Sequence, residues 1–234
     1  MTMSGFRVQP QTGHLDRLKR MYGYLCKFWH YKIRFCTKEI DYSMVPHQEY
    51  DWDNTPYGDE KESLPTDAPP PLGKRVVLTH YFNANLMHDV SLGKAVTGCF
   101  HLVNKTPIMW YSKKQATSET ATYGSEFIVC RTCCEQIIDL RNSFWYLSVP
   151  VYHKSYTFGD NLAQITSATV PQGKLNKRHN ILSFHSVRDL ISKGFVNLIH
   201  IASDFNASDI LSKNWKYQAS YDNILKPFYI MRVM

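Results

Sequence analysis

The stretch that decides the fold is RVVLTHYFNANLMHDVSLGKAVTGCFHLVNKTPIMWY, residues 75–111. Apolar residues with high β propensity gather in three segments of it, which we predict as strands over 75–83, 96–103 and 107–111. The pair Asn104-Lys105 between the second and third segments predicts a tight turn. Strands that follow one another so closely predict neighbouring positions in a single sheet.

Helical and extended patterns alternate after this stretch. Residues 118–147 contain no proline, and their apolar residues recur at helical spacing. Gly194 predicts the end of a later helix, because glycine readily takes the left-handed conformation that closes helices. The other elements are predicted as a strand over 156–159, a helix over 161–169, a helix over 177–193, a strand over 195–201 and a helix over 207–213. This order predicts an α/β domain over residues 75–216, with one mixed sheet flanked by helices.

Two segments of different character precede this domain. In residues 1–40, apolar residues repeat every three or four positions, which predicts an amphipathic helix with basic residues on its other faces. Those basic residues form either a solvated face or a nucleic-acid contact. Residues 41–74 are acidic and rich in proline, so we interpret them as an extended linker. Its aromatic residues would hold it against a neighbouring surface; they are Tyr50, Trp52 and Tyr57. Residues 217–234 are assigned as a C-terminal tail.

The charge distribution favours a polyanionic partner. The net charge of +7 divides into +6 over residues 1–40, −5 over 41–75 and +6 over 76–234. A sequence pI of about 9.0 is typical of proteins that bind nucleic acid, although it does not identify one.

Composition and length favour a globular intracellular protein. Hydrophobic residues make up 44% of the 234 residues, which is enough for a core. No run approaches the ~18 apolar residues of a membrane span, and no apolar stretch follows a basic start, so we expect no membrane association and no secretory signal. The cytoplasm and the nucleus are the expected locations.

The six cysteines are interpreted as small buried apolar residues in a reducing compartment. They are Cys26, Cys36, Cys99, Cys130, Cys133 and Cys134. None forms the paired CxxC…CxxC spacing of a zinc site, and the one CxxC, over 130–133, falls within a predicted helix.

Three acidic residues stand where open α/β folds place their active sites. Asp160 follows a predicted strand, Glu126 lies in the first turns of the long helix, and Asp209 begins the last helix. Carboxylates that converge from different elements could hold two divalent cations about 4 Å apart for phosphodiester hydrolysis. Alternatively, the two aspartates are helix caps or first-turn acids, and Glu126 is an exposed helical residue.

Five motifs in this order resemble the RNase H domain of copia-type retrotransposon polyproteins. They are SKKQ at 112–115, TYGSEF at 122–127, FGDN at 158–161, KRHNILSFHSVR at 177–188 and NASDILSK at 206–213. VTG at 96–98 fits the second strand of that family more loosely. The resemblance covers about residues 75–216. The basic helix near the start is similar to the segment that follows the reverse transcriptase in these polyproteins.

The resemblance implies an RNase H-like fold, with a mixed five-stranded sheet flanked by helices, and hydrolysis of the RNA strand of RNA–DNA hybrids. It implies that Glu126, Asp160 and Asp209 bind Mg²⁺ or Mn²⁺, with two ions in an active site. Phosphates and 2′-hydroxyls of the hybrid would be contacted by residues around the site. The candidates are Lys113, Lys114, Gln115, Asn161, Lys177, Arg178 and His179. A reverse-transcriptase domain is a further expected partner, a virus-like particle is one expected location, and the oligomeric state stays open.

One position departs from the family pattern. The first strand of the family ends in a D-A-D or D-A-N element, whereas this chain has FNAN at 82–85, so Asn83 stands where the resemblance implies the carboxylate that bridges both ions. An amide carries no charge and bridges two cations poorly, so we expect impaired metal binding and catalysis. Asp89, six residues past the expected strand end, is a weaker substitute. Whether the chain is an enzyme stays open, and a non-catalytic nucleic-acid-binding module or an inert transposon remnant are the alternatives.

Overall fold

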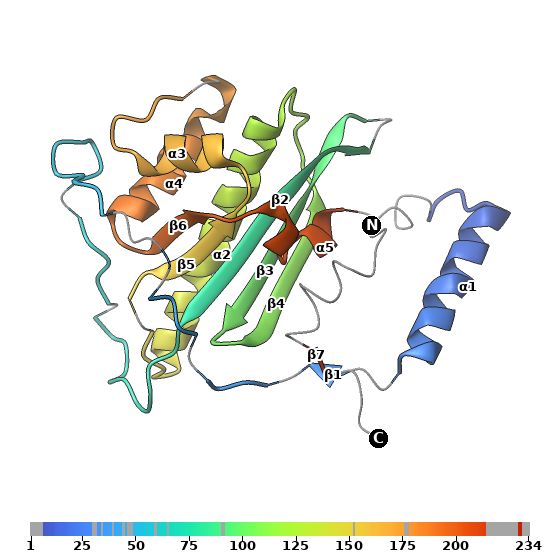
Figure 1. Ribbon diagram of the computed structural model, residues 1–234, viewed down its shortest axis with the longest axis horizontal. Helices are drawn as coiled ribbons and strands as arrows, with labels where there is room; N and C mark the ends of the chain where they lie inside the picture. Colours follow the sequence, from blue (N-terminus) through green and yellow to red (C-terminus); the bar gives the residue numbers. More distant parts are fainter. Residues whose placement is uncertain are drawn as a thin grey trace.

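Five strands form one mixed sheet in the order β4-β3-β2-β5-β6 (Figure 1). Their bounds are Leu78–Asp89 for β2, Lys94–Val103 for β3, Thr106–Lys114 for β4, Ser155–Gly159 for β5 and Val196–His200 for β6. The computed structural model describes residues 7–29, 32–33, 35–38, 40–43, 45, 49–58, 60–64, 66–89, 92–151, 153–175, 178–213 and 229–230. The strands β2, β3 and β4 are antiparallel neighbours, whereas β5 runs parallel to both β2 and β6. This topology confirms the predicted mixed five-stranded sheet.

The helices follow the predicted order. Their bounds are Thr12–Lys27 for α1, Thr122–Tyr146 for α2, Leu162–Thr169 for α3, Ile181–Ser192 for α4 and Asp209–Ser212 for α5, with short 3₁₀ turns at Arg178–Asn180 (η2) and Ser203–Phe205 (η3). The helix predicted over 177–193 is therefore a 3₁₀ turn followed by α4. Gly194 has a φ of +84° directly after α4, the left-handed conformation that its position predicted. Two further short strands, β1 at Lys32–Ile33 and β7 at Tyr229–Ile230, pair with each other in antiparallel fashion.

Strand β2 is longer than its local sequence predicts. The expected strand end at Asn83 is wrong, because β2 continues to Asp89 and pairs with β3 as far as Asp89–Lys94, across an irregularity after Asn85. Asparagine has low β propensity, but the hydrogen bonds that β3 supplies override it. Asn83 therefore lies inside a paired strand, and Asp89, previously placed past the strand end, belongs to the same strand.

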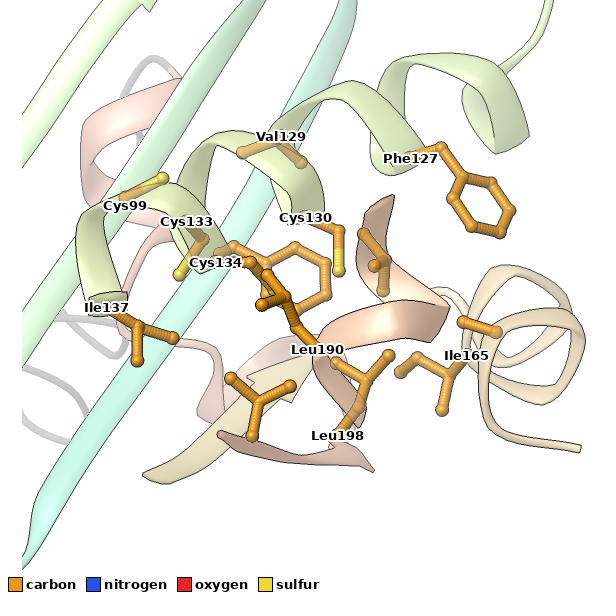
Figure 2. Packing of buried hydrophobic residues seen from close by; sticks show 14 of the residues in the cluster. Cys99, Phe127, Val129, Cys130, Cys133, Cys134, Ile137, Ile165, Leu190 and Leu198 are labelled. Atoms are coloured by element: carbon orange, nitrogen blue, oxygen red, sulfur yellow. The ribbon is translucent and has the colours of Figure 1, made fainter. Parts of the chain in front are cut away.

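The main core lies between one face of the sheet and the helices α2, α3 and α4. Figure 2 shows the cysteines and aliphatic residues of α2 facing side chains from β3, α3, α4 and β6. Cys99, Cys130, Cys133 and Cys134 are all fully buried and free of disulfides, which confirms their interpretation as buried apolar groups. That interpretation is wrong for Cys26, which is exposed, and Cys36 is half-buried. Phe82 from β2 is also fully buried, and Gly159 makes room for its ring.

The opposite face of the sheet is covered by α5 and by the segment around Tyr42. Phe100 and Leu102 of β3 pack there against Ala207. Tyr42 lies over Tyr156, with 4.1 Å between ring centroids, and its hydroxyl is 2.7 Å from Thr79 Oγ1. The helix on this face, α5, has 4 residues, whereas α2, α3 and α4 pack on the other face.

The acidic segment packs along the domain at its described positions. Trp52 is buried, and the Arg188 guanidinium stacks on its ring at 4.8 Å from the centroid. Farther along, the half-buried Glu62 forms an ion pair with the buried Arg141 on α2, with 2.6 Å between Oε1 and Nε. Ion pairs with one member inside the core are expensive to break, so this segment is anchored to the domain at two points.

Helix α1 contributes no residue to the core, and in Figure 1 it stands apart from the sheet. Its apolar stripe is exposed; the large members are Leu15, Leu18, Met21, Tyr22 and Leu25. Among the described residues, none of the helices combines the length and the apolar character that a bilayer crossing needs.

Candidate carboxylate site

Four predicted site positions meet at one end of the sheet. The last parallel pair between β2 and β5 joins Tyr81 to Phe158, and both Asn83 and Asp160 lie two residues farther on. Carboxyl ends of neighbouring parallel strands meet at the same edge, which brings these two side chains together. Glu126 reaches the same place from the start of α2, and Asp209 from the start of α5. The sequence motifs are therefore assembled by topology into one group.

Glu126 occupies the most buried place in the site. Its side chain is 3% exposed, and the backbone N–H of Ala84 donates to Oε1 at 3.1 Å. The second oxygen, Oε2, is buried and has no hydrogen-bond partner. Burial raises the pKa of the Glu126 carboxyl well above its usual value, and the charge of Asp160 adds to this rise. A carboxyl in this position favours its neutral form unless a cation is supplied.

Asn83 and Asp209 are joined by a hydrogen bond. The amide Nδ2 of Asn83 donates to Asp209 Oδ1 and lies 3.0 Å from Ser212 Oγ. The amide nitrogen therefore occupies the side of Asp209 that a second carboxylate could share with it through a metal ion. A nitrogen that donates in this way cannot also act as a metal ligand.

Lys213 supplies the site with its own positive charge. Its ammonium donates to both Asp209 oxygens, at 2.9 Å to Oδ1 and 2.8 Å to Oδ2, and lies 4.0 Å from Asp160 Oδ2. Burial raises the pKa of Asp209, and the hydrogen bond from Lys213 opposes this rise. The sequence motif contained Lys213, but its spacing of four residues from Asp209 on a helix was the signal that could have assigned it this contact.

Asp160 is held at the rim by a serine that the sequence did not single out. Ser203 Oγ in η3 donates to Asp160 Oδ2 at 2.9 Å. Asn161, the next residue, caps α3 instead, because its Oδ1 accepts from Gln164 N at 3.0 Å. The cap begins α3 at Leu162, directly after the end of β5 that carries Asp160.

The short helix α5 is fixed by close contacts with the sheet. A Cβ on Gly98 would lie 2.9 Å from Ser208 O and 3.1 Å from Leu211 Cβ, so only glycine lets α5 approach β3 this closely. Asn206 Nδ2 donates to Phe82 O at 3.0 Å, while its Oδ1 accepts from the Ser208 hydroxyl. These contacts position Asp209 opposite Asn83.

The other predicted binding residues surround this end of the sheet in different ways. Lys113 is exposed and Lys114 half-buried on β4, and Arg178 is exposed in η2. His179 lies 2.7 Å from Glu119 Oε2, through Nε2, with just over half of its side chain exposed. Glu119 was absent from the sequence prediction. Lys177 lies outside the described residues.

Gln115 differs from these because it is buried. Its Nε2 lies 3.2 Å from Thr97 Oγ1 and 3.0 Å from Ser125 O, so it ties β3 to the first turn of α2. Asn161 and Gln115 are thus both engaged within the protein, and the side chain of Gln115 does not lie on the surface.

The carboxylates of the site are of the ligand type that divalent cations prefer, but they are not arranged to bind two ions. Oxygen ligands are what Mg²⁺ and Mn²⁺ prefer, and the unpartnered Oε2 of Glu126 is a natural ligand. Within the described part of the chain, however, Glu126, Asp160 and Asp209 do not bring their oxygens within 4.8 Å of one another as a set. With the amide of Asn83 and the ammonium of Lys213 on Asp209, these residues do not fit two ions as they stand.

Comparison with known proteins gives a distant relative. The chain is 22% identical over 142 residues to the "Retrovirus-related Pol polyprotein from transposon TNT 1-94" of Nicotiana tabacum, and the match covers 60% of this chain. The chain spans 10% of the length of that curated relative. This match confirms the distant resemblance to a copia-type polyprotein. A scan against protein-family models finds no match.

Several solved RNase H structures resemble the chain weakly. The N-terminal RNase H domain of rv2228c from Mycobacterium tuberculosis has a TM-score of 0.47 and 11% identity, covering 58% of this chain and 91% of that one. RNase H1 from Halobacterium salinarum NRC-1 has a TM-score of 0.45 and 15% identity, covering 59% and 95%. LC11-RNase H1 in complex with RNA/DNA hybrid has a TM-score of 0.45 and 15% identity, covering 58% and 93%. The fold assignment rests on the strand order and connections described above.

Proposed function

We propose that this chain is the RNase H-like domain of a retrotransposon polyprotein that binds RNA–DNA hybrids, with its hydrolytic step impaired at Asn83. The distant match to a retrovirus-related Pol polyprotein and the order of the five motifs support this class of protein. The gathering of Glu126, Asp160 and Asp209 at one edge of the sheet supports the nuclease ancestry of the site.

One observation carries the impairment. The side-chain amide of Asn83 donates a hydrogen bond to Asp209, in the place where the resemblance implies a carboxylate that shares metal ions with Asp209. The amide removes one negative charge and points a proton at the remaining carboxylate. Lys213 then neutralises the same group, so Asp209 is satisfied without divalent cations. Mg²⁺ or Mn²⁺, if bound, would be held by Glu126 and the two aspartates.

Hybrid binding is assigned to exposed basic groups on both sides of the carboxylates. Lys113 lies on β4 opposite Thr97 of β3, and Arg178 and His179 lie beside the start of α2. Lysine and arginine contact phosphates without reading bases, and contacts to 2′-hydroxyls in the shallow minor groove distinguish RNA from DNA. The net charge of +7 adds a long-range attraction to the polyanion.

The cleavage test compares the chain with its Asn83→Asp variant on a labelled RNA–DNA hybrid with Mg²⁺ or Mn²⁺. We expect the variant to cut and the unmodified chain to cut far more slowly or not at all. If both cut equally, another group replaces the missing carboxylate and the proposed impairment is wrong. If neither cuts although both are folded, the assignment of Glu126, Asp160 and Asp209 as ligands of catalytic metal ions is wrong.

The binding test measures affinity for the hybrid as a function of salt. Affinity should fall with rising salt concentration, and Lys113→Ala and Arg178→Ala should each reduce the salt slope by about one. Lys154→Ala is the matched control, because Lys154 is exposed directly before β5, at the other end of that strand from Asp160. A chain that shows no measurable binding at moderate salt would be an inert remnant.

A further inference from the structure

A second group of ligand-type side chains lies inside the core, between the sheet and α2. The two Sγ atoms of Cys99 and Cys133 and one ring nitrogen of His101 all lie within 4.8 Å of one another. Cys99 and His101 are two residues apart on β3, so both side chains point toward α2, and Cys133 faces them from the buried side of that helix. Figure 2 shows Cys99 and Cys133 side by side in this layer.

From this arrangement we infer that Cys99, His101 and Cys133 form a binding site for a thiophilic divalent cation, namely Zn²⁺. Zn²⁺ is bound in proteins by thiolates and imidazoles, whereas the carboxylate site offers oxygen ligands suited to harder cations. The two thiolates would neutralise the charge of the ion, which is what a site of low dielectric constant requires. The inference is independent of the proposed function.

Both ring nitrogens of His101 have a neighbouring polar partner. Its Nε2 lies 2.8 Å from Gln136 Oε1, and its Nδ1 lies 2.8 Å from His80 Nδ1. A histidine ligand uses one ring nitrogen for the metal and donates from the other to a neighbouring acceptor. Whichever ring nitrogen of His101 binds the metal gives up its present contact, and the other nitrogen keeps its partner, Gln136 Oε1 or His80 Nδ1.

Ordinary packing explains the cysteines but not the histidines beside them. Buried thiols act as small apolar groups and need no partner. His80 and His101 are both fully buried, and His80 Nε2 has no hydrogen-bond partner. A buried polar atom without a partner costs free energy, so two imidazoles in this layer indicate a polar role there.

The geometry requires only a small closure of the three side chains. Bonds of about 2.3 Å to sulfur and about 2.0–2.1 Å to nitrogen place neighbouring ligand atoms of a tetrahedral zinc site roughly 3.6 Å apart. The three ligand atoms already lie within 4.8 Å of one another, so the side chains have at most about 1 Å to close. Binding forms two sulfur–metal bonds and one nitrogen–metal bond, so these residues fill three of the four positions of a tetrahedral site. It releases the two thiol protons to solvent. Because all three residues are fully buried, the ion enters as the chain folds.

The test refolds the full chain from denaturant under reducing conditions with Zn²⁺ or Co²⁺, and then removes loosely held metal. We expect one ion per chain. Co²⁺ should give the thiolate-to-metal charge-transfer absorption that a carboxylate site cannot produce. Zn²⁺ should raise the midpoint of thermal unfolding. A chain that refolds to its native circular dichroism without retaining metal, or that binds Co²⁺ without this absorption, overturns the inference.

Matched variants locate the ion. Cys99→Ser and Cys133→Ser should each abolish the absorption and the thermal shift. Cys134→Ser is the control, because Cys134 is equally buried on the same helix but outside the ligand set. If a ligand variant fails to fold, the measurement on the unmodified chain still decides. Retention of one ion by Cys133→Ser, or equal loss by Cys134→Ser, would show that the cluster is not the site.

Discussion

Replacing Asn83 by aspartate tests the arrangement of the carboxylate site directly. The amide of Asn83 donates to Asp209, and Asn83 is 1% exposed. In the Asn83→Asp variant this hydrogen bond to a charged group, worth about 1.5–3 kcal/mol, is lost. Two carboxylates about 3 Å apart repel each other by about 5 kcal/mol at an effective dielectric constant of about 20.

The measured cost should be smaller than this repulsion. Lys213 contacts Asp209, whose side chain is 21% exposed, and one carboxyl can take up a proton instead of remaining charged. A rise of about two pKa units corresponds to about 2.7 kcal/mol. We therefore expect the variant to lose about 2–4 kcal/mol of unfolding free energy near pH 7.5 without divalent cations.

The loss should depend on pH with a defined sign. In the folded variant the carboxyl pKa values lie above those of the unfolded chain, near 4, so the folded state keeps protons that the unfolded state releases. The destabilisation is absent below about pH 4, grows as pH rises through the raised pKa, and is complete above it. Urea unfolding at several pH values measures this difference.

Divalent cations should reverse the loss. A ligand at 100 times its Kd adds about 2.7 kcal/mol to the stability of the state that binds it, so Mg²⁺ or Mn²⁺ should stabilise the variant more than the unmodified chain. Asn85→Asp is the control, because Asn85 donates to the backbone oxygen of Ser212 rather than to a carboxylate. Equal stability of the Asn83→Asp variant and the unmodified chain at pH 7.5 without metal would refute the proposed contact with Asp209.

Three further substitutions test the surroundings of the site. Glu126→Gln removes a carboxyl whose pKa is raised mainly by burial, so the variant should be more stable than the unmodified chain near pH 8. Urea unfolding should show that this advantage disappears as pH falls toward 4, and a constant difference in stability across this range would contradict the reasoning. Lys213→Met removes the cation that contacts both Asp209 oxygens and should raise the affinity for Mn²⁺ by roughly tenfold in calorimetric titration. Lys113→Met is the control for net charge, and unchanged affinity in Lys213→Met would show that Lys213 does not compete with the metal ion. Gly98→Ala puts a Cβ 2.9 Å from Ser208 O and should cost about 1–3 kcal/mol of unfolding free energy by displacing α5, with no loss if α5 is free to move.

Local sequence was a good guide wherever one element carried its own signal. The structure contains the elements predicted from the β-prone segments and from the helical spacing over 118–147. It also has the positive φ that the glycine at position 194 predicted. Strand β2 shows the limit of such signals. Its last residues have low β propensity, and only pairing with β3 extends the strand to Asp89.

The sequence by itself determined which residue types the chain offers and in what order: an α/β alternation, three acids at element ends and an asparagine at the first position. Only the tertiary structure decided what touches what. It placed the Asn83 amide and the Lys213 ammonium on the same carboxylate, because α5 closes against Gly98. It also brought Cys99 and His101 to Cys133, because a strand and a helix that are separate in sequence share one core. Spacing along a chain fixes neighbours within an element, whereas contacts between elements depend on register, close approach and burial, which no local pattern records.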